Sequence, residues 1–363
     1  MIEGKQIDVL IVEDSKVARE HLMHILEADK AIRVIGTAAD GDEAVAFVRE
    51  KRPDVITMDI HMPGMNGLEA TRRIMETSPA PIIIVSASYD RNDVEKAFLS
   101  MEAGALAIVE KPVGEAHPLY GEAAKELVQT VKLMSEVKVV RRWKRKRPSE
   151  PLNAVIPEEI LEKGPKNIRL VAIGASTGGP PVLQTILSAL SAGFPAPILI
   201  VQHIATGFVD GMLDWLRQTT ALPIHIAMNR EHLLPGHVYF APDGFHLGVY
   251  NQSRISLSNA PPENGVRPSV SYLFRSAMGV FGGNLAAVLL TGMGRDGAEE
   301  LRMLLEKGAV TIAQDRESSV VYGMPGEAAN LKAARYILPP EKIASALLGL
   351  ARDKKTDAHN RTA

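Results

Sequence analysis

The sequence predicts two consecutive α/β domains, each built on a doubly wound sheet of parallel strands. Two observations carry this prediction: short apolar runs alternate with amphipathic helical patterns, and the alternation is interrupted once by a stretch rich in proline and charge. The length of 363 residues agrees with it, since one hydrophobic core rarely organises so long a chain. We place the domains at residues 1–125 and 168–350, a helical and basic linker at 126–167, and a polar tail at 351–363.

The first domain is predicted from five apolar runs with helical patterns between them. Each run is short and apolar throughout, which is typical of strands buried on both faces of a parallel sheet. The first helix is predicted at Lys16–Asp29, because its apolar residues share one face and Ser15 can cap its N-terminus. The predicted strands are Ile7–Val12, Val34–Ala38, Val55–Met58, Ile82–Val85 and Ala107–Val109.

The second domain repeats the same alternation from residue 168. Its first helix is expected after Pro180–Pro181, because proline is accepted at a helix start and Val182–Leu190 carries one apolar face. A small antiparallel ribbon is predicted within Val238–Leu257, with Asp243–Gly244 as a turn signal. The predicted strands are Leu170–Ala175, Ile198–Gln202, Val238–Ala241, Ala286–Thr291 and Val310–Ala313.

Composition excludes several classes of protein. The apolar share of 46% and charged share of 23% are ordinary for globular proteins, and the net charge of −2 predicts neither nucleic-acid nor membrane binding. The basic run Arg141–Arg147, which contains Trp143, is interpreted as a solvated part of the linker. The absence of cysteine excludes disulfides and thiolate metal sites and fits a reducing cytoplasm. We find no signal peptide and no apolar run long enough for membrane insertion, so we expect a cytoplasmic protein.

Acidic side chains and a lysine follow the strand ends of the first domain. Glu13 and Asp14 follow the first strand, Asp59 ends the third, Ser86 ends the fourth and Lys111 follows the fifth. Because the carboxyl ends of parallel strands meet at one crevice, we expect these side chains to lie together. Three carboxylates require a cation, and hard oxygen ligands suit Mg²⁺. Any one of these residues alone could be an ordinary loop residue, but the ordered set predicts a carboxylate that attacks phosphorus to form an aspartyl phosphate.

The segments VEDS, MDIHMPGMNG and EKP, over roughly residues 5–125, resemble the receiver domains of two-component response regulators. The resemblance implies a flavodoxin-like doubly wound fold and a histidine kinase as phosphodonor. It implies these site residues: the phosphoacceptor Asp59, the Mg²⁺ ligands Glu13, Asp14 and Asp59 with the backbone carbonyl of His61, and the phosphoryl-sensing pair Ser86 and Lys111.

Two positions depart from the receiver pattern. Many receiver domains carry an aromatic switch residue three positions before the lysine, where this chain has Ile108. Many have Asp-Gly where this chain has Asn66–Gly67. The first departure argues against signalling by rotation of an aromatic ring, and we interpret the second as harmless.

A serine in the second domain lies in a pattern typical of a nucleophile. Ser176 is the centre of Gly174–Gly178, a G-x-S-x-G segment between a predicted strand and helix. The N–H of Thr177 then lies near a helix N-terminus, where partial positive charge favours an oxyanion. A serine hydroxyl needs a base. His203 ends the next strand and Asp296 follows a later one, so both are expected at the same sheet edge as a Ser-His-Asp triad.

Position alone leaves alternatives open for the base and the acid. His246, in the predicted ribbon, is the second candidate for the base, and Asp243 and Asp315 compete with Asp296 for the acid. Asp315 also ends a strand, so its position does not exclude it. The other histidines considered in this domain are His225, His232 and His237.

A glycine pattern offers a competing function. Gly292–Gly297 reads G-x-G-x-x-G between a strand and a helix, and Asp315 follows the next strand, as in dinucleotide-binding folds. Against NAD binding, the unit comes late in the domain, charged residues lie inside the turn, and Ser176 and His203 have no role. A phosphate-binding loop at Gly174–Gly179 is excluded, because Pro180–Pro181 stand where lysine and a hydroxyl residue are required.

The segments IGASTGGP, VQHI, RPSV, LLTGMGRDGA and TIAQD-x-x-SSVVYGMPGEA resemble the catalytic domain of the chemotaxis protein-glutamate methylesterases, over about residues 168–350. The resemblance implies the nucleophile Ser176, the base His203 and the orienting Asp296, with Thr177 and Met293 at the oxyanion site. It implies no cofactor for this domain. A departure at Glu299–Glu300, where small residues are expected, is predicted to change only the surface.

The two resemblances together imply a regulated enzyme. Its expected substrate is a methyl-accepting chemoreceptor, on which it hydrolyses glutamate γ-methyl esters to release methanol and deamidates glutamines. Phosphorylation of Asp59 is expected to open the Ser176 cleft, which the receiver domain covers when unphosphorylated. The competing interpretations are a receiver-linked protein that binds receptors without turnover, and an NAD-dependent enzyme.

Overall fold

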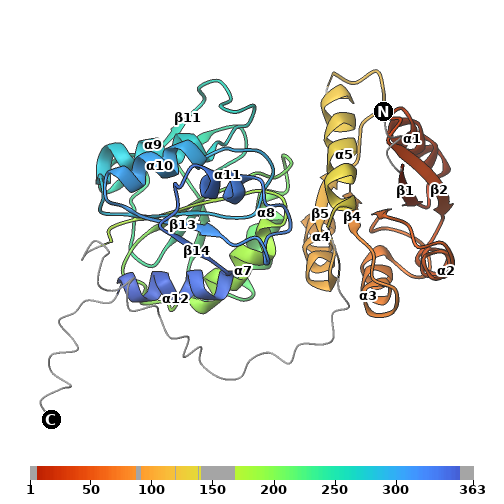
Figure 1. Ribbon diagram of the computed structural model, residues 1–363, viewed down its shortest axis with the longest axis horizontal. Coiled ribbons are helices and arrows are strands. Elements are labelled where there is room, and N and C mark those ends of the chain that lie inside the picture. The colour runs from red at the N-terminus through yellow and green to blue at the C-terminus, as the bar shows by residue number, and fades with distance from the viewer. Residues whose placement is uncertain (1–5, 87–90, 119, 138, 140–167, 352–363) are drawn as a thin grey trace, which may run out of the picture. The chain divides into compact units, whose positions relative to one another are not determined.

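The computed structural model describes residues 6–86, 91–118, 120–137, 139 and 168–351. The chain divides into two compact units, residues 1–149 and 150–363, and each is an α/β fold (Figure 1). Most of the predicted linker, including Arg141–Arg147, lies outside the described residues, as does the tail from residue 352. The predicted boundaries at residues 125 and 167 therefore stay predictions.

The first unit contains a five-stranded parallel sheet in the order β2-β1-β3-β4-β5. This is the predicted doubly wound fold, and all five strands occur where apolar runs predicted them. Helices α1 and α5 contact each other, and α2, α3 and α4 contact in succession. The element bounds are β1 (Ile7–Val12), α1 (Lys16–Glu27), β2 (Ile32–Ala38), α2 (Gly41–Lys51), β3 (Val55–Met58), α3 (Gly67–Thr77), β4 (Ile82–Ser86), α4 (Arg91–Ala103), β5 (Ala107–Glu110) and α5 (Tyr120–Ser135).

Local side chains start the helices of this unit. The hydroxyl of Ser15 accepts from the N–H of Ala18 at the start of α1, which confirms the predicted cap. The carboxylate of Asp40 caps α2 and the amide oxygen of Asn66 caps α3 in the same way. Helix α1 ends at Glu27, two residues before the predicted end.

The strand order of this sheet reverses between β1 and β3, both of which are buried. Ligands of doubly wound sheets bind at such a reversal, beyond the carboxyl ends of the strands. The predicted acidic site lies at this point of the fold.

The second unit contains a seven-stranded parallel sheet in the order β14-β13-β12-β6-β7-β9-β8. Figure 1 shows α7 and α12 on one side of this sheet and α9 and α10 on the other. The element bounds are β6 (Val171–Ala175), α7 (Gly179–Ala189), β7 (Ile198–Gln202), α8 (Val209–Arg217), β8 (Ile224–Ile226), β9 (Val238–Phe240), β10 (His246–Asn251), β11 (Arg254–Ser258), α9 (Val270–Phe281), β12 (Ala286–Leu289), α10 (Ala298–Glu306), β13 (Val310–Gln314), α11 (Met324–Asn330), β14 (Tyr336–Leu338) and α12 (Pro340–Ala351).

The antiparallel ribbon exists, but its predicted turn is wrong. The ribbon consists of β10 and β11, which reverse direction between Asn251 and Arg254. The predicted first strand of the ribbon, β9, instead joins the parallel sheet between β7 and β8. Asp243–Gly244 does turn the chain, with Gly244 at φ +73°, but it connects strands of two different sheets. A turn signal predicts that the chain reverses, not which strands then pair.

The sheet of the second unit reverses its strand order at the central strand β6. The chain builds β7, β9 and β8 on one side of β6 and then returns to add β12, β13 and β14 on the other. The carboxyl ends of β6, β7 and β12 therefore lie next to one another, and the predicted triad residues follow these three strands. Among the described residues, no helix has the length and apolar character needed to cross a membrane.

Candidate functional site

Ser176 lies on a tight turn between β6 and α7. Its N–H donates to the carbonyl of Thr291 (3.0 Å), and its carbonyl accepts from the N–H of Gly179 (2.8 Å). The turn passes through Gly178 at φ +77°, a conformation that glycine adopts without strain. A Cβ atom on Gly292 would lie 2.6 Å from the Cβ of Ser176, so only glycine leaves room for the serine there. The strand, turn and helix thus form the elbow that the sequence predicted.

His203 is held beside Ser176 by main-chain and side-chain hydrogen bonds. The N–H of His203 donates to the carbonyl of Ala175 (2.9 Å). The amide Nε2 of Gln202 donates both to the carbonyl of Ser176 (2.9 Å) and to that of His203 (2.8 Å). Gly179 makes room for this amide, because a Cβ there would lie 2.2 Å from the Gln202 oxygen. One buried side chain therefore ties the predicted nucleophile to the predicted base.

Asp296 forms a hydrogen bond with His203, as the sequence predicted. The imidazole Nε2 of His203 lies 3.0 Å from Oδ2 of Asp296, whose exposed fraction is only 4%. An ionised carboxylate can only accept, so Nε2 is the donor, and Nδ1 is left as the ring nitrogen that can accept a proton. The other donors to the carboxylate are Val270 N (2.6 Å, to Oδ2) and Asn264 Nδ2 (2.9 Å), Ser269 Oγ (2.8 Å) and Ser271 N (3.1 Å), all three to Oδ1.

These donors keep Asp296 ionised. Burial on its own raises the pKa of Asp296, but the hydrogen bonds from His203, Val270 and Asn264 outweigh it and hold the pKa well below its usual value. The carboxylate also lies at the N-terminus of α9, where the backbone N–H groups and the helix dipole favour negative charge. An ionised carboxylate at Nε2 can stabilise a positive charge on the imidazole.

A cavity of about 710 Å³ opens in front of this pair. Met293, 43% exposed, lies on its wall. Thr177 follows the serine, and its carbonyl accepts from the Thr291 hydroxyl (3.0 Å). The roles of Thr177 and Met293 at an oxyanion site stay predictions. The lining residues are His203, Asn264, Val266, Met293, Gly294, Arg295, Asp296 and Glu327.

The alternative base and acids have other partners. His246 is fully buried; its Nδ1 accepts from the N–H of Ser269 (3.2 Å), and its Nε2 donates to the carbonyl of Pro261 (3.1 Å). Both ring nitrogens are thus bonded to the main chain, and His246 cannot serve as a base. Asp243 accepts from the N–H of Gly207 in a neighbouring loop, and Asp315 accepts from the N–H of Ser318 in its own loop; in the described residues neither forms a hydrogen bond with His203.

The glycines of the turn after β12 serve the serine site. Gly292 makes room for Ser176, and a Cβ on Gly297 would lie 2.5 Å from the side chain of Val270, at the start of α9. Packing within the unit therefore accounts for the first and third glycines, and Gly294 between them has φ +81°, which favours glycine without a dinucleotide.

Three residues with clear contacts in this site were not assigned a role from the sequence. Gln202 ends a predicted strand, where an apolar residue is equally common, so nothing marked it. Ser269 lies within the RPSV segment, which was noted only as part of a resemblance. Asn264 precedes Gly265, and Asn-Gly is a strong signal for a two-residue turn. That signal locates the turn but does not reveal that Asp296 lies beside it.

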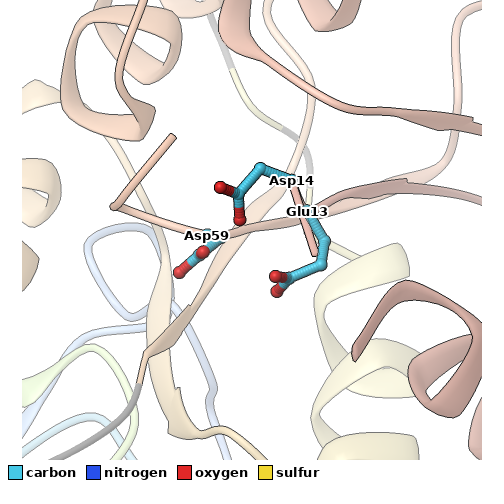
Figure 2. Close-up of side chains that lie close together, drawn as sticks. All are labelled: Glu13, Asp14 and Asp59. Atoms are coloured by element: carbon cyan, nitrogen blue, oxygen red, sulfur yellow. The ribbon is translucent and has the colours of Figure 1, made fainter. Parts of the chain in front are cut away.

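The acidic side chains of the first unit come together as predicted. Glu13, Asp14 and Asp59 each offer a carboxylate oxygen, and these three oxygens lie within 4.8 Å of one another (Figure 2). The ammonium of Lys111 lies 2.8 Å from Oε2 of Glu13 and 3.3 Å from Oδ2 of Asp59. The lysine therefore bridges two of the three carboxylates.

One lysine does not neutralise this cluster. Burial is the main cause that raises the pKa of both Glu13 and Asp59; the charge of Asp59 adds to it at Glu13 and that of Asp14 at Asp59, and Lys111 only partly offsets these effects. For Lys111, burial lowers the pKa, but its contacts with the two carboxylates outweigh burial and raise it. The cluster carries excess negative charge on hard oxygen donors, and this donor set fits Mg²⁺.

The neighbouring strands place the remaining predicted residues at the same edge. Ser86, 2% exposed, ends β4, and its carbonyl accepts from the N–H of Lys111 (2.9 Å). His61, two residues after Asp59, is exposed, and the role of its carbonyl stays a prediction. A Cβ on Gly67 would lie 2.0 Å from the carbonyl oxygen of Asp59, so this position requires glycine.

Comparisons with known proteins identify both units. Residues 171–347 match the family described as CheB methylesterase, and residues 9–119 match the response regulator receiver domain. Over 348 residues the chain is 54% identical to a protein-glutamate methylesterase/protein-glutamine glutaminase of Nitrosospira multiformis, covering 96% of this chain and 98% of the relative. The chain belongs to this family. A relative with the same description from Geobacter metallireducens, numbered 4, is 55% identical over 354 residues, covering 96% of this chain and 100% of the relative.

Among solved structures, the CheB methylesterase catalytic domain of Thermotoga maritima is 38% identical to this chain, with a TM-score of 0.49. It covers 51% of this chain and 99% of that domain. We call the matched segments the receiver unit (residues 9–119) and the esterase unit (residues 171–347).

The departure at Glu299–Glu300 reaches below the surface of the esterase unit. Glu299 is exposed, as expected, but the side chain of Glu300 is only 12% exposed and accepts from Nη1 of Arg275 (2.9 Å). The other terminal nitrogen of Arg275 lies 2.6 and 2.7 Å from the carboxylate oxygens of Glu263. The expectation of a purely superficial change is therefore wrong for Glu300, which joins α10 to α9 through this arginine.

Proposed function

We propose that the chain is a phosphorylation-activated serine hydrolase of chemoreceptors. It hydrolyses glutamate γ-methyl esters, releasing methanol, and deamidates glutamines. The observation that carries this proposal is the hydrogen bond between buried Asp296 and partly exposed His203 at the strand end next to Ser176, with Gln202 bonded to the carbonyls of Ser176 and His203. Relatives of nearly equal length described as methylesterase and glutaminase support the same activity.

The chemistry follows from the roles of three side chains. The hydroxyl oxygen of Ser176 attacks the γ-carbonyl carbon, and its proton passes to Nδ1 of His203. Asp296 stabilises the resulting imidazolium through Nε2. The imidazolium then protonates the departing methoxide, so methanol leaves and a glutamyl ester of Ser176 remains. Water attacks this ester with His203 as the base, which releases glutamate and restores the serine. With a glutamine substrate the leaving group is ammonia.

The oxyanion of each tetrahedral intermediate needs hydrogen-bond donors. We assign this role to Thr177, at the N-terminal side of α7, and to Met293, on the cavity wall. Removing one donor that is already in place at the site of developing charge lowers the rate by a factor of about 10²–10³.

The receiver unit supplies the regulatory input. We assign Asp59 as the phosphoacceptor, with Mg²⁺ held by Glu13, Asp14, Asp59 and the backbone carbonyl of His61. A bound Mg²⁺ supplies positive charge to the phosphoryl oxygens. Lys111, which already contacts Asp59 at 3.3 Å, moves onto a phosphoryl oxygen once one is present, and the Ser86 hydroxyl holds a second.

Phosphorylation then shifts the chain between populations in which the Ser176 cleft is closed or open. The phosphodonor is a histidine kinase, the substrate is a methyl-accepting chemoreceptor, and we place the reaction in the cytoplasm.

The decisive experiment measures methanol release from membranes that carry methylated receptors. The parent chain is expected to release methanol, and acetyl phosphate with Mg²⁺ is expected to increase the rate. Ser176→Ala abolishes release, whereas Asp59→Asn keeps the basal rate but loses the response to acetyl phosphate. Ser188→Ala, an exposed serine on α7, is the matched control and retains parent activity.

Two results would contradict the proposal. Methanol release by Ser176→Ala at the parent rate would remove the nucleophile assignment. Receptor binding by the parent without any turnover would show that the chain is a binding protein instead.

A further inference from the structure

We propose that Asn264 is a positioning residue for the esterase reaction, held in place by an ion-pair clamp of Glu263, Arg275 and Glu300. Its side-chain amide fixes Asp296 and thereby His203. This inference rests on the proposed serine esterase function and adds a residue that acts through the triad without touching the reacting atoms.

The amide group of Asn264 has a single orientation. Its Nδ2 lies 2.9 Å from Oδ1 of Asp296 and 3.2 Å from Oγ of Ser271. Since an ionised carboxylate only accepts, the nitrogen must face Asp296. Its two hydrogens have two acceptors, and Ser271 Oγ also accepts from the N–H of Gly297, in the turn that carries Asp296. The asparagine is thus part of a connected network around the carboxylate.

Asn264 differs from the other donors to Asp296 in its position in the chain. Ser269, Val270 and Ser271 form the start of α9, whereas Asn264 belongs to the separate turn after β11. It also lines the catalytic cavity together with His203. The carboxylate is therefore held from two sides, with the helix N-terminus on one and the asparagine turn on the other.

The turn itself is well defined. Glu263 and Val266 exchange two backbone hydrogen bonds, of 3.1 and 2.9 Å. Between them, Asn264 has φ +52° and Gly265 has φ +80°. A two-residue turn with both φ angles positive strongly favours Asn-Gly. Asparagine therefore suits the backbone conformation at position 264. In this conformation its side-chain amide reaches Asp296.

Arg275 clamps this turn to the helices that carry the site. Its guanidinium binds Glu263, the first residue of the turn, at 2.6 and 2.7 Å, and Glu300 of α10 at 2.9 Å. The clamp joins the turn, α9 and α10. Because Asp296 lies two residues before α10, next to its N-cap Gly297, the ion pairs connect the segments that carry both partners of the Asn264–Asp296 bond.

Asn264, Ser269 and Ser271 all donate to Oδ1 of Asp296, and the other oxygen, Oδ2, faces His203. When Asn264 is removed, the carboxylate charge is shared more with the imidazole, so the positively charged form of His203 is better stabilised. The carboxylate is also less firmly placed. Among the described residues, the titratable and charged groups that face this network are His203, Glu263, Arg275, Asp296 and Glu300, with His246 behind Ser269 and Arg295 and Glu327 on the cavity wall.

The test uses Asn264→Gly, which removes the amide but tolerates the positive φ angle of the turn. Asn264→Asp keeps the size and replaces the donor with a second carboxylate. Asn229→Ala is the matched control, because Asn229 accepts from the N–H of Leu257 in the same unit outside the triad. Full-length chains are assayed for methanol release across pH, and His203 is titrated by NMR in each variant, with thermal unfolding as a check of folding.

For Asn264→Gly we expect kcat on the pH plateau to fall about tenfold, the loss of one hydrogen bond to a charged group, with little change in KM. The acid limb of the pH profile and the NMR pKa of His203 both move to higher pH. Asn264→Asp is expected to be slower than Asn264→Gly, because like charges repel Asp296. Asn229→Ala behaves as the parent.

Either of two outcomes overturns the inference: kcat of Asn264→Gly equal to that of the control, or a loss of activity without movement of the His203 titration. The NMR readout does not require turnover, so an inactive parent chain would contradict the proposed function and leave this inference separately testable.

Discussion

Asp296→Asn tests the central electrostatic claim about the esterase unit. The substitution keeps the shape of the side chain and removes its charge. Oδ1 accepts three hydrogen bonds and Oδ2 accepts two. The new NH₂ group therefore takes the Oδ2 position, because two hydrogen bonds are lost there and three would be lost at Oδ1. There it faces Nε2 of His203 and the N–H of Val270, two groups that previously donated to an oxygen.

His203 can adapt to this change, but only by adopting the wrong tautomer. It accepts from the new NH₂ at Nε2 and carries its proton on Nδ1, the nitrogen that must take the proton of Ser176. We expect kcat to fall by about four orders of magnitude, as in other triads whose acid is replaced by its amide. The N–H of Val270 is left without an acceptor, which costs about 1–3 kcal/mol of unfolding free energy. At about 2–4 °C per kcal/mol, the melting temperature falls by several degrees.

The same variant changes how stability depends on pH. The pKa of Asp296 is lower in the folded chain than in the unfolded chain, where it is near 3.8. Its ionisation therefore stabilises the fold fully above that pH, and this contribution is lost as the pH falls toward the folded value. The variant lacks this component, so the difference in stability between parent and variant narrows in acid.

The assay combines methanol release with thermal unfolding of the full-length chain. Asp315→Asn is the matched control, because Asp315 was the competing acid and its carboxylate accepts from Ser318 rather than from His203. A kcat for Asp296→Asn within about tenfold of the parent would refute the tautomer argument. A large loss in Asp315→Asn instead would transfer the role of acid to that residue.

Three further substitutions test other parts of the chain. Lys111→Met removes the cation beside Asp59, so Mg²⁺ binding, followed by intrinsic fluorescence or calorimetry, tightens by about tenfold or more; weaker binding would contradict the electrostatic account. Gly67→Ala forces a Cβ against the Asp59 carbonyl and destabilises the receiver unit by about 1–3 kcal/mol, measured by denaturant unfolding, whereas an unchanged midpoint would show that the turn relaxes freely. Glu300→Ala removes one arm of the Arg275 clamp and costs about 0.5–1 kcal/mol, since the arginine is partly exposed. That loss should shrink at high salt, and a salt-independent loss would point to packing instead.

Apolar runs were sufficient to predict the main strands of both sheets. Most of these runs are buried on both faces of a parallel sheet, which is the case that a continuous apolar pattern describes; the partly exposed edge strand β2 is the exception. The two strands that were missed, β8 (Ile224–Ile226) and β14 (Tyr336–Leu338), lie at the sheet edges and are three residues long. Three residues are too few to show a strand pattern, whereas the longer edge strands β2 and β5 were predicted.

The site was predictable where chemistry and strand ends coincide. Ser176, His203 and Asp296 each follow a buried strand. Because the carboxyl ends of parallel strands meet at one edge, all three could be predicted to lie together, although Asp315 also follows such a strand. Hydrogen bonds separated the candidates, since only Asp296 faces the imidazole of His203. Contacts made by irregular segments were not predictable. Asn264 reaches the triad through a turn whose placement depends on ion pairs between distant parts of the chain.

Gln202 has a consequence for how activation will appear in kinetics. Its amide fastens the nucleophile turn and the base loop to each other, so the two catalytic groups move as one body. If the receiver controls access, phosphorylation changes how often a bulky protein substrate reaches the serine and leaves the intrinsic reactivity of that serine as it was. A small soluble ester should be cleaved equally fast in either phosphorylation state, while receptor demethylation accelerates.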